Sequence, residues 1–589
     1  MPVYIDGKEV GVVVNTDKMH NGKYWIKVID YDGTILKEDW LDTGDTFTLP
    51  TEPPAHDRLT FQEWTSPVDI VDGQIIVEDS DITIGATYIT TSENDEFDIE
   101  LNDSTGLYVQ FRNINVTSMV DNNCSISVSW GDGTTDTYAV RSGANSTIYS
   151  HTYQQKVNYT IEVSATGSFE FYFSVSNGAY SLFTNIDYNN LYCCKNIRLG
   201  LEQHTSLLRM CQYAVSLETI TIPKRTQPYT NLERMFYYCY NLKACVIPNS
   251  ITEIGQYSFY SCYNLKNIVL PQSVNSIKSD AFCNCSNLES ISISNNISEL
   301  DTNAFFFFIS LNSLNLEKTN ITEIESDLCN GCKKIKDIEL TLPITEIGTY
   351  AFQNCYSLNT VDLSDCDNLT TININAFNGC HNLKNITLPD NLKDIGSSAF
   401  DYCYSLNVKV YDNAGYLSSK NNSYLVLKSC VNTHISSCVV HKDCKIILSD
   451  AFENCYYLKT VSLPDGLLQL GYCAFNQCRE LQSVILPNSL KDIDNAVFMS
   501  CSGLTSITIP SSVENVGGQC FQSCSSLLSV TYLGQAPNIN SSQYSSCNAI
   551  TKYDFRYCTT IPTLSNVSYL GHATNCQIII PDALYDEWT

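Results

Sequence analysis

The motif Phe-x-x-Cys-x-x-Leu recurs along most of this chain at a spacing of about 23 residues. Full copies begin at Phe236, Phe259, Phe282, Phe352, Phe377, Phe400, Phe452, Phe475, Phe498 and Phe521. A regular period in this range predicts stacked structural units, a solenoid, and not a compact globule. Because solenoids expose long surfaces, the pattern favours a binding protein over an enzyme.

Many of the 27 cysteines belong to this motif. The repeat position is filled by Cys239, Cys262, Cys285, Cys332, Cys355, Cys380, Cys403, Cys455, Cys478, Cys501, Cys524 and Cys547. Phe308 and Ala214 fill the same position in two other repeats. A position that accepts Cys, Phe or Ala is predicted to be a core site, where cysteine acts as a small apolar side chain. The cysteine count therefore says little about the redox compartment.

The rest of each repeat predicts a short strand and a turn. Ile268, Leu270 and Pro271 illustrate the Ile-x-Leu-Pro tract, in which both aliphatic residues point inward and proline ends the strand. The residues before the motif phenylalanine predict a helical turn that buries this ring. The residue between the two inward ones is expected to form an exposed, mildly polar strand face that could receive a partner. These residues are Thr221, Val246, Val269, Ser292, Asn315, Glu339, Asp362 and Thr387.

The repeat register breaks once, because Phe400 and Phe452 are 52 residues apart. The sequence predicts an insertion near 408–444, which is either a projecting β-hairpin or a joint between two blocks of repeats. Residue types that bind Zn²⁺ gather there, but their spacing matches no zinc motif. They are Cys430, His434, Cys438, His441 and Cys444. We expect packing or a disulfide at these residues, and no metal site.

Residues 1–90 are predicted to form a small β-domain, with strands near 24–29, 74–77 and 82–84. The order of several residues in this segment is Gly44, the Leu-Pro pair at 49–50, Phe61 with Trp64, and the Asp-Ile-Thr run at 81–83. This order resembles the small β-repeat of bacterial surface proteins, including internalins. Phe61 and Trp64 are expected to form its core.

Residues 91–178 are predicted to form a second β-domain. Three features follow in order: a Trp-Gly-Asp-Gly turn from Trp130, a His-x-Tyr from His151, and a Tyr-x-Ile-x-Val strand from Tyr159. Asp132 and Gly133 predict a tight hairpin. Together these features resemble the polycystic-kidney-disease (PKD) type immunoglobulin-like sandwich, which implies a spacer module.

Residues 179–589 are predicted to form the solenoid. Its motif resembles the BspA-like class of leucine-rich repeat proteins, so the predicted fold class is mainly β: a leucine-rich solenoid preceded by two small β-domains. The resemblance implies a surface or secreted binding protein without a cofactor. It also implies bacterial adhesins or phage proteins as the setting.

Composition excludes several classes of partner. The net charge of −29 opposes contact with nucleic acid and with anionic membrane surfaces. The sequence contains no run of about 18 apolar residues, so it predicts no membrane-spanning helix. From the two ends of the sequence we expect no signal peptide or anchor, unless a leader has been removed, and the Met1-Pro2 start slightly favours a phage virion protein over an exported adhesin.

Catalytic motifs are not found, and the eight histidines are scattered, so we expect no catalytic residues. The candidate binding site is instead an aromatic row beside the repeated motif, where other repeats carry polar residues. Its members are Tyr237, Tyr238, Tyr240, Tyr260, Tyr263, Phe306 and Phe307. Exposed aromatic rings in a row suit sugars or protein hot spots.

These observations predict a non-enzymatic recognition protein that binds a protein or glycan on a cell surface. Two extracellular settings remain open, a bacterial cell surface and a phage virion. The alternative is a structural component whose repeats serve as a spacer or assembly surface, with a homo-oligomer or another virion protein as partner.

Overall fold

The computed structural model describes most of the chain. The described residues are 3–5, 8–10, 23–78, 80–92, 94–100, 108–113, 124–140, 147–166, 194–200, 207–224, 232–316, 319–340, 343–534, 538–539, 542–559, 563–564 and 576–582. They divide into two compact units. Unit 1 contains residues 1–299 and 308–315, and unit 2 contains residues 300–307 and 316–589.

The described residues are all-β and contain no α-helix, which confirms the predicted fold class. None of them forms a helix long and apolar enough to cross a membrane. The helical turn predicted before each motif phenylalanine is therefore wrong. Residues with positive φ, such as Arg234 at 54° and Tyr238 at 63°, interrupt each turn and prevent a continuous helix.

The first β-domain of unit 1 contains a four-stranded sheet in the order β4-β3-β8-β6. Its strands are β3 (Tyr24–Ile29), β4 (Ile35–Leu41), β6 (Leu59–Thr65) and β8 (Ile82–Thr90), with β5 (Thr46–Thr48) and β7 (Gln74–Ile76) as a separate pair. A short hairpin, β1 (Val3–Ile5) and β2 (Lys8–Val10), precedes them. Phe61 and Trp64 are half-buried at the edge of the core, with ring centroids 5.2 Å apart.

The second β-domain shares one sheet with the first repeats. The order is β12-β11-β14-β9-β15-β16, in which β9 pairs antiparallel with the repeat strand β15. These strands are β9 (Asp95–Glu100), β11 (Cys124–Ser129), β12 (Thr135–Val140), β14 (Asn158–Thr166), β15 (Cys194–Arg198) and β16 (Thr219–Thr221). A further pair contains β10 (Tyr108–Asn113) and β13 (Thr147–Thr152). The second β-domain therefore covers the open edge of the repeat ladder.

The predicted motif residues of this domain come together in space. Trp130 is fully buried and accepts a hydrogen bond at its carbonyl oxygen from the Tyr153 hydroxyl, at 2.9 Å. His151 lies 2.7 Å from Asp132 and stacks on Trp130. Tyr159 stacks on Tyr153, with ring centroids 4.2 Å apart.

The repeats of unit 1 stack in register through two ladders of parallel strands. One joins β17 (Ala244–Val246) to β19 (Asn267–Val269), and the other joins β18 (Glu253–Ile254) to β20 (Ser276–Ile277). A further short strand, β21, spans Glu299–Leu300. Motif phenylalanines of successive repeats stack inside, with Phe236 and Phe259 4.9 Å apart and Phe259 and Phe282 5.2 Å apart.

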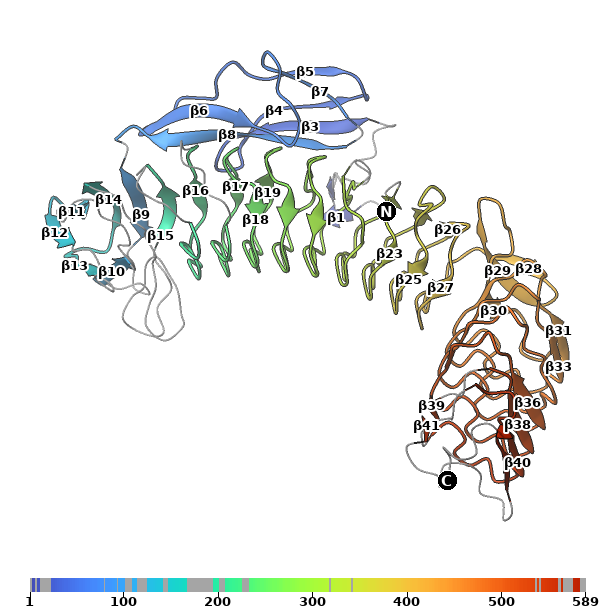
Figure 1. The fold of residues 1–589 in the computed structure, drawn as a ribbon. Coiled ribbons are helices and arrows are strands. Elements are labelled where there is room, and N and C mark those ends of the chain that lie inside the picture. The colour runs from blue at the N-terminus through green and yellow to red at the C-terminus, as the bar shows by residue number, and fades with distance from the viewer. Residues whose placement is uncertain are drawn as a thin grey trace. The chain divides into compact units, whose positions relative to one another are not determined.

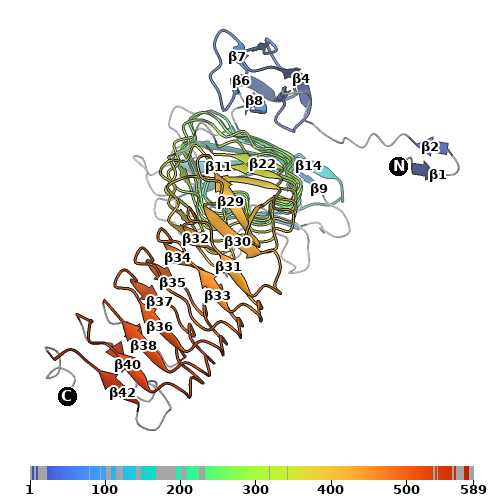
Figure 2. The same ribbon diagram turned by 90° about the vertical axis from the view of Figure 1, so that its right-hand side faces the viewer.

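Unit 2 repeats the same arrangement in two blocks. The first block contains β22 (Asp337–Glu339), β24 (Thr360–Asp362) and β26 (Asn385–Leu388) in one ladder, and β23 (Glu346–Ile347), β25 (Thr371–Ile372) and β27 (Asp394–Ile395) in the other. The second block, prominent in Figure 2, begins with β31 (Ser437–Val439), β32 (Ile446–Ile447), β33 (Thr460–Ser462), β34 (Gln469–Leu470), β35 (Asp492–Ile493) and β37 (Asn515–Val516). Its last strands are β36 (Ser506–Ile509), β38 (Ser529–Tyr532), β39 (Asn538–Ile539), β40 (Lys552–Asp554), β41 (Thr563–Leu564) and β42 (Gln577–Ile579).

The predicted insertion lies between these blocks. It contains β28 (Lys409–Tyr411), β29 (Ala414–Ser419) and β30 (Val426–Cys430), joined antiparallel. Strand β29 also pairs parallel with β26. Strand β30 pairs parallel with β32, the next strand in Figure 2. The element is thus a hairpin and also a joint, because it connects the first ladder of one block to the second ladder of the next.

The motif cysteines do more than fill space. Except for Cys455, which follows the insertion, each motif thiol donates a hydrogen bond to a backbone carbonyl of the preceding repeat, and for most of them this is the carbonyl of the motif phenylalanine. The Sγ–O distance is 3.2 Å from Cys285 to Phe259 and 3.1 Å from Cys501 to Phe475. A small side chain with a weak donor therefore fits this position, whereas the sequence suggested only an apolar one.

Candidate recognition surfaces

The turns that carry the aromatic row have an alternating hydrogen-bond pattern. The amides of Phe236 and Tyr238 donate to Ser258 and Tyr260 of the next repeat. The amide of Tyr237, between them, donates within its own turn to Arg234. This alternation buries Phe236 and leaves the neighbouring tyrosines half-buried.

Five of the predicted tyrosines meet in unit 1. Tyr240 and Tyr263 stack with ring centroids 5.2 Å apart and are 38% and 41% exposed. Tyr237 stacks on Tyr260 at 5.2 Å. Tyr238 lies edge-on to Tyr240, at 5.6 Å, and so connects the two stacks. We call these residues, with the two added below, the tyrosine cluster.

Sequence reasoning missed two members of the tyrosine cluster. Tyr213 stacks on Tyr238 with centroids 5.5 Å apart, and Tyr257 lies 5.6 Å from Tyr260. The Arg234 guanidinium lies 5.2 Å from the Tyr257 ring centre and adds a cation–π contact. Tyr213 occupies the same repeat position as Tyr238, but in an early repeat that lacks the full motif, because Cys211 and Ala214 stand where Phe and Cys are expected. Tyr257 lies two residues before Phe259, outside the positions that define the aromatic row.

Three hydroxyls of the tyrosine cluster, those of Tyr237, Tyr240 and Tyr260, remain neutral at physiological pH. Burial raises the pKa of Tyr260 to about 12, and the charges of Cys283, Tyr238 and Asp280 act in the same direction. Burial also raises the pKa of Tyr237 and of Tyr240. Neutral phenols both donate and accept hydrogen bonds, so the surface combines apolar rings with adaptable polar tips.

Phe306 and Phe307, the other predicted members of the row, belong to unit 2. Their rings meet edge-to-face with centroids 4.6 Å apart. Phe307 is 39% exposed, and its ring lies against Gly331 of the next repeat. The two phenylalanines form a small apolar patch of their own.

The strand face predicted to be exposed is covered in unit 1, which corrects that expectation. Thr221, Val246, Val269 and Ser292 are all at most 8% exposed. Strand β8 of the first β-domain crosses β16, β17 and β19 (Figure 1). A Cβ on Gly85 would lie 2.6 Å from Val246, so only glycine allows this approach.

Polar groups also join the first β-domain to the covered face. The Ser292 hydroxyl donates to the carbonyl oxygen of Asp81 at 2.8 Å and accepts from the amide of Thr83 at 3.2 Å. The Lys27 ammonium donates to Asn267 at 2.9 Å. The strand face of these repeats is therefore occupied by the chain itself. In unit 2, by contrast, Asp362 of the same face is exposed.

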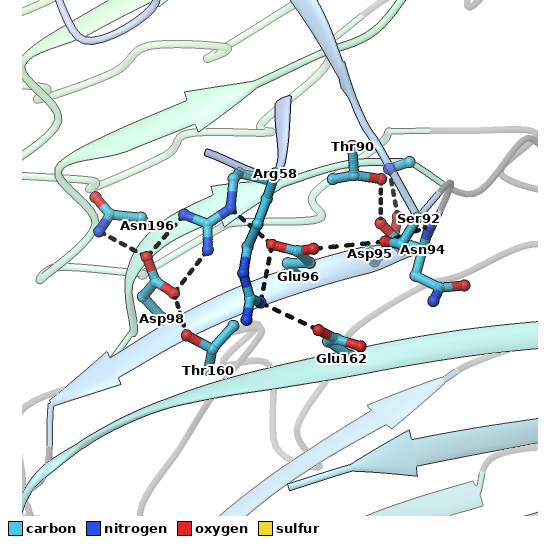
Figure 3. A network of polar contacts seen from close by, with 12 residues as sticks. Arg58, Thr90, Ser92, Asn94, Asp95, Glu96, Asp98, Thr160, Glu162 and Asn196 are labelled. Carbon is cyan, nitrogen blue, oxygen red and sulfur yellow. Dashed lines mark hydrogen bonds and ion pairs between the residues drawn. The ribbon is translucent and has the colours of Figure 1, made fainter. Parts of the chain in front are cut away.

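An ion-pair network holds the second β-domain to the first repeat (Figure 3). Arg198 of β15 donates two hydrogen bonds to Asp98, both at 2.7 Å, and one to Glu96 at 2.9 Å. Arg58 of the first β-domain lies 3.6 Å from Glu96 and 3.1 Å from Glu162. The network thus connects both β-domains to the solenoid.

The cysteines and histidines of the insertion have separate packing roles. Cys438 and Cys444 donate to the carbonyl oxygens of Asp412 and Ile446. His441 stacks on Tyr424 at 3.8 Å, and His434 stacks on Tyr457 at 5.8 Å. Cys430 donates to the carbonyl oxygen of Asn432. Among the described residues, no group of three or more His, Cys, Asp or Glu side chains is arranged to hold a metal ion.

Comparison with known proteins agrees with this repeat geometry. The family described as the BspA type leucine rich repeat region matches residues 230–359, 305–428 and 424–551, in six copies. The chain belongs to this BspA-type leucine-rich repeat family. Proteins of this family are typically non-enzymatic surface adhesion or protein-binding proteins. No curated protein matches the chain.

Several solved structures of leucine-rich repeat proteins resemble it. A leucine-rich cell surface protein from Faecalibacterium prausnitzii A2-165 is 25% identical, with a TM-score of 0.31, over 59% of this chain and 87% of that one. A leucine-rich repeat protein from Bacteroides ovatus ATCC 8483 is 22% identical, with a TM-score of 0.30, over 51% and 82%. The pneumococcal vaccine antigen PcpA is 20% identical, with a TM-score of 0.30, over 58% and 85%.

Proposed function

We propose that this protein is a non-enzymatic recognition protein whose solenoid binds a protein or glycan on a cell surface. The observation that carries the proposal is the tyrosine cluster, in which stacked rings form a continuous, partly exposed surface. Tyrosine contributes a large contact area at low conformational cost and is enriched in binding hot spots.

Two settings fit this function, a bacterial surface adhesin and a host-binding protein of a phage virion. In both, we propose, residues 1–90 correspond to the small β-repeat of bacterial surface proteins and residues 91–178 to a PKD-like domain. The contact among Trp130, Asp132, His151 and Tyr153 supports the second assignment, because these are the motif residues on which the resemblance depends.

The proposal is tested with the full-length protein on bacterial cells, host matrix proteins and a glycan array. We expect saturable binding to one of these surfaces, weakened at least tenfold by the double substitution Tyr240→Ala and Tyr263→Ala. The matched control is Tyr456→Ala with Tyr557→Ala, since these tyrosines are 39% and 57% exposed in other repeats.

Each outcome separates the candidate functions. Binding that survives the Tyr240 and Tyr263 substitutions would place recognition on another surface. Absence of binding to every surface, together with a stable homo-oligomer or stoichiometric assembly with a virion protein, would favour the structural alternative.

A further inference from the structure

The joint between the two blocks of unit 2 contains a hollow of about 390 Å³ that is open to solvent on one side. One wall is the turn from Phe400 to Tyr404, and the other walls come from Val408, from Lys428 and Ser429 of β30, and from residues 448–450. This volume falls within the range of small-molecule sites, about 300–1,000 Å³. The hollow exists because the insertion separates two turns that would otherwise stack directly.

The same separation leaves two backbone donors free. In the regular repeats the amide of the motif phenylalanine, and the amide two residues later, donate to carbonyls of the next turn; Phe377 and Gly379 follow this rule. In the described structure the amides of Phe400 and Tyr402 have no hydrogen-bond partner. The carbonyl oxygen of Ala451, which the Phe400 amide would reach in a regular repeat, instead accepts a hydrogen bond from the amide of Cys430. Two amides therefore point along the repeat stack to the place where the hollow lies.

Aromatic rings and polar side chains complete the walls. Tyr402 and Tyr404 are 59% and 76% exposed, with ring centroids 6.0 Å apart. Asp401 and Asp450 supply carboxyl acceptors, and Lys428 supplies a donor. Burial and the charges of Asp401 and Glu453 raise the pKa of Asp450 to about 7, so this carboxyl both donates and accepts near neutral pH.

A strip of stacked rings leads away from the hollow along the first block. Tyr404 stacks on His381 with centroids 5.5 Å apart, and His381 stacks on Tyr356 at 4.9 Å. The Lys333 ammonium lies 5.6 Å from the Tyr356 ring centre. Three successive repeats thus present one ring each.

We infer that the hollow at residues 398–450 is a binding site for one terminal residue of a neutral oligosaccharide. A pyranose ring has apolar C–H faces that pack on tyrosine, and hydroxyls that both donate and accept hydrogen bonds. The free amides and the Lys428 ammonium can donate hydrogen bonds to the oxygens of these hydroxyls, and the two aspartates can accept hydrogen bonds from them. The aspartates also oppose an anionic sugar. Following sugar units would lie on the strip of Tyr404, His381 and Tyr356.

This site is distinct from the tyrosine cluster, and the substitutions at Tyr404 and at Tyr240 with Tyr263 distinguish a failure of this inference from a failure of the proposed function. The probes are the neutral trisaccharides maltotriose, cellotriose and chitotriose, with sialyllactose as the anionic comparison. Binding to the full-length protein is measured by saturation-transfer NMR and titration calorimetry. We expect at least one neutral trisaccharide to bind, and sialyllactose to bind more weakly.

Substitutions locate the site. Tyr404→Ala should weaken trisaccharide binding at least tenfold with an unchanged melting temperature, because this side chain is 76% exposed. Tyr557→Ala, the matched control at 57% exposure, should leave binding unchanged. The double substitution at Tyr240 and Tyr263 should also leave it unchanged. The inference is overturned if no neutral trisaccharide binds, if sialyllactose binds better, or if Tyr404→Ala has no effect.

Discussion

Replacing Arg198 with methionine should destabilise the contact between the second β-domain and the first repeat. The side chain of Arg198 is 13% exposed, and that of its partner Glu96 is 2% exposed. Methionine keeps an apolar stem of similar length but removes all three charge-assisted hydrogen bonds to Glu96 and Asp98. Both carboxylates then lose their main partner while remaining largely out of water.

The expected loss of stability depends on the contacts that Glu96 and Asp98 keep in Arg198→Met. Removing one partner of a buried ion pair costs about 3–5 kcal/mol. Arg58 still lies 3.6 Å from Glu96, and Thr160 and Asn196 still donate to Asp98 at 2.8 and 3.1 Å. These contacts place the expected loss at the lower end, about 3 kcal/mol.

Hydrogen exchange measured on the full chain gives the local free energy of opening. We expect the amides of β9 and β15 to lose about 3 kcal/mol of protection in Arg198→Met. The protection of amides in the second block of unit 2 against hydrogen exchange should not change. Arg479→Met serves as the control, because Arg479 is exposed and its guanidinium contacts the neutral Gln477 side chain and the Tyr456 ring, not a carboxylate. A loss below about 1 kcal/mol, the level of a surface ion pair, would refute the reasoning.

The pH dependence supplies a second check. Burial raises the pKa of Asp98, but the hydrogen bonds and charge of Arg198 outweigh it and hold this pKa below its ordinary value. The ion pair therefore stabilises the fold above the unfolded-state pKa of about 4 and loses this effect as the pH falls. The difference between wild type and Arg198→Met should shrink in acid.

Two further predictions concern unit 2. Because burial and the charges of Asp401 and Glu453 raise the pKa of Asp450 to about 7, the free energy of unfolding should fall as the pH rises from about 4 to 7, by at most about 4 kcal/mol. Urea titrations should show that Asp450→Asn removes this slope while the exposed control Asp465→Asn keeps it; equal slopes would contradict the assignment. Replacing Cys501 with alanine should lower the free energy of unfolding by about 1–3 kcal/mol, because the hydrogen bond to the Phe475 carbonyl is lost. Replacing Cys501 with valine should lower it further, because the branched side chain lies against this carbonyl and cannot donate to it. If thermal denaturation shows a higher melting temperature for the valine variant than for the alanine variant, the position is purely apolar and the prediction is wrong.

The stacking of the repeats could be predicted from the sequence because one period fixes it. Phe236, Phe259 and Phe282 are each fully buried and stack on one another as their spacing requires. The conformation of the turn could not be predicted in this way. A Phe-x-x-Cys spacing of three is compatible with a helical turn, and only the positive φ of residues such as Tyr238 distinguishes the actual backbone.

The covered strand face shows another limit of sequence reasoning. Thr221, Val246, Val269 and Ser292 are small or β-branched residues, which suit a solvent-exposed strand and a packed one equally well. A signal did exist in β8, whose nine residues contain no charge although the chain is strongly acidic. Such a strand is buried on both faces, as β8 is, and so requires a second surface to cover it.

These contacts also narrow where unit 1 can bind a partner. The second β-domain covers the edge of the repeat ladder through β9 and β15, which removes an open edge that could join other strands. The first β-domain covers the strand face through β8. Of the repeat surfaces described in unit 1, the ladder of β18, β20 and β21 and the turns therefore remain, and the turns carry the tyrosine cluster. A partner that binds these turns would meet stacked tyrosines, whereas one that binds the β16, β17 and β19 face would first have to displace β8. Substitutions at Tyr240 and Tyr263 therefore discriminate better than changes on the covered strands.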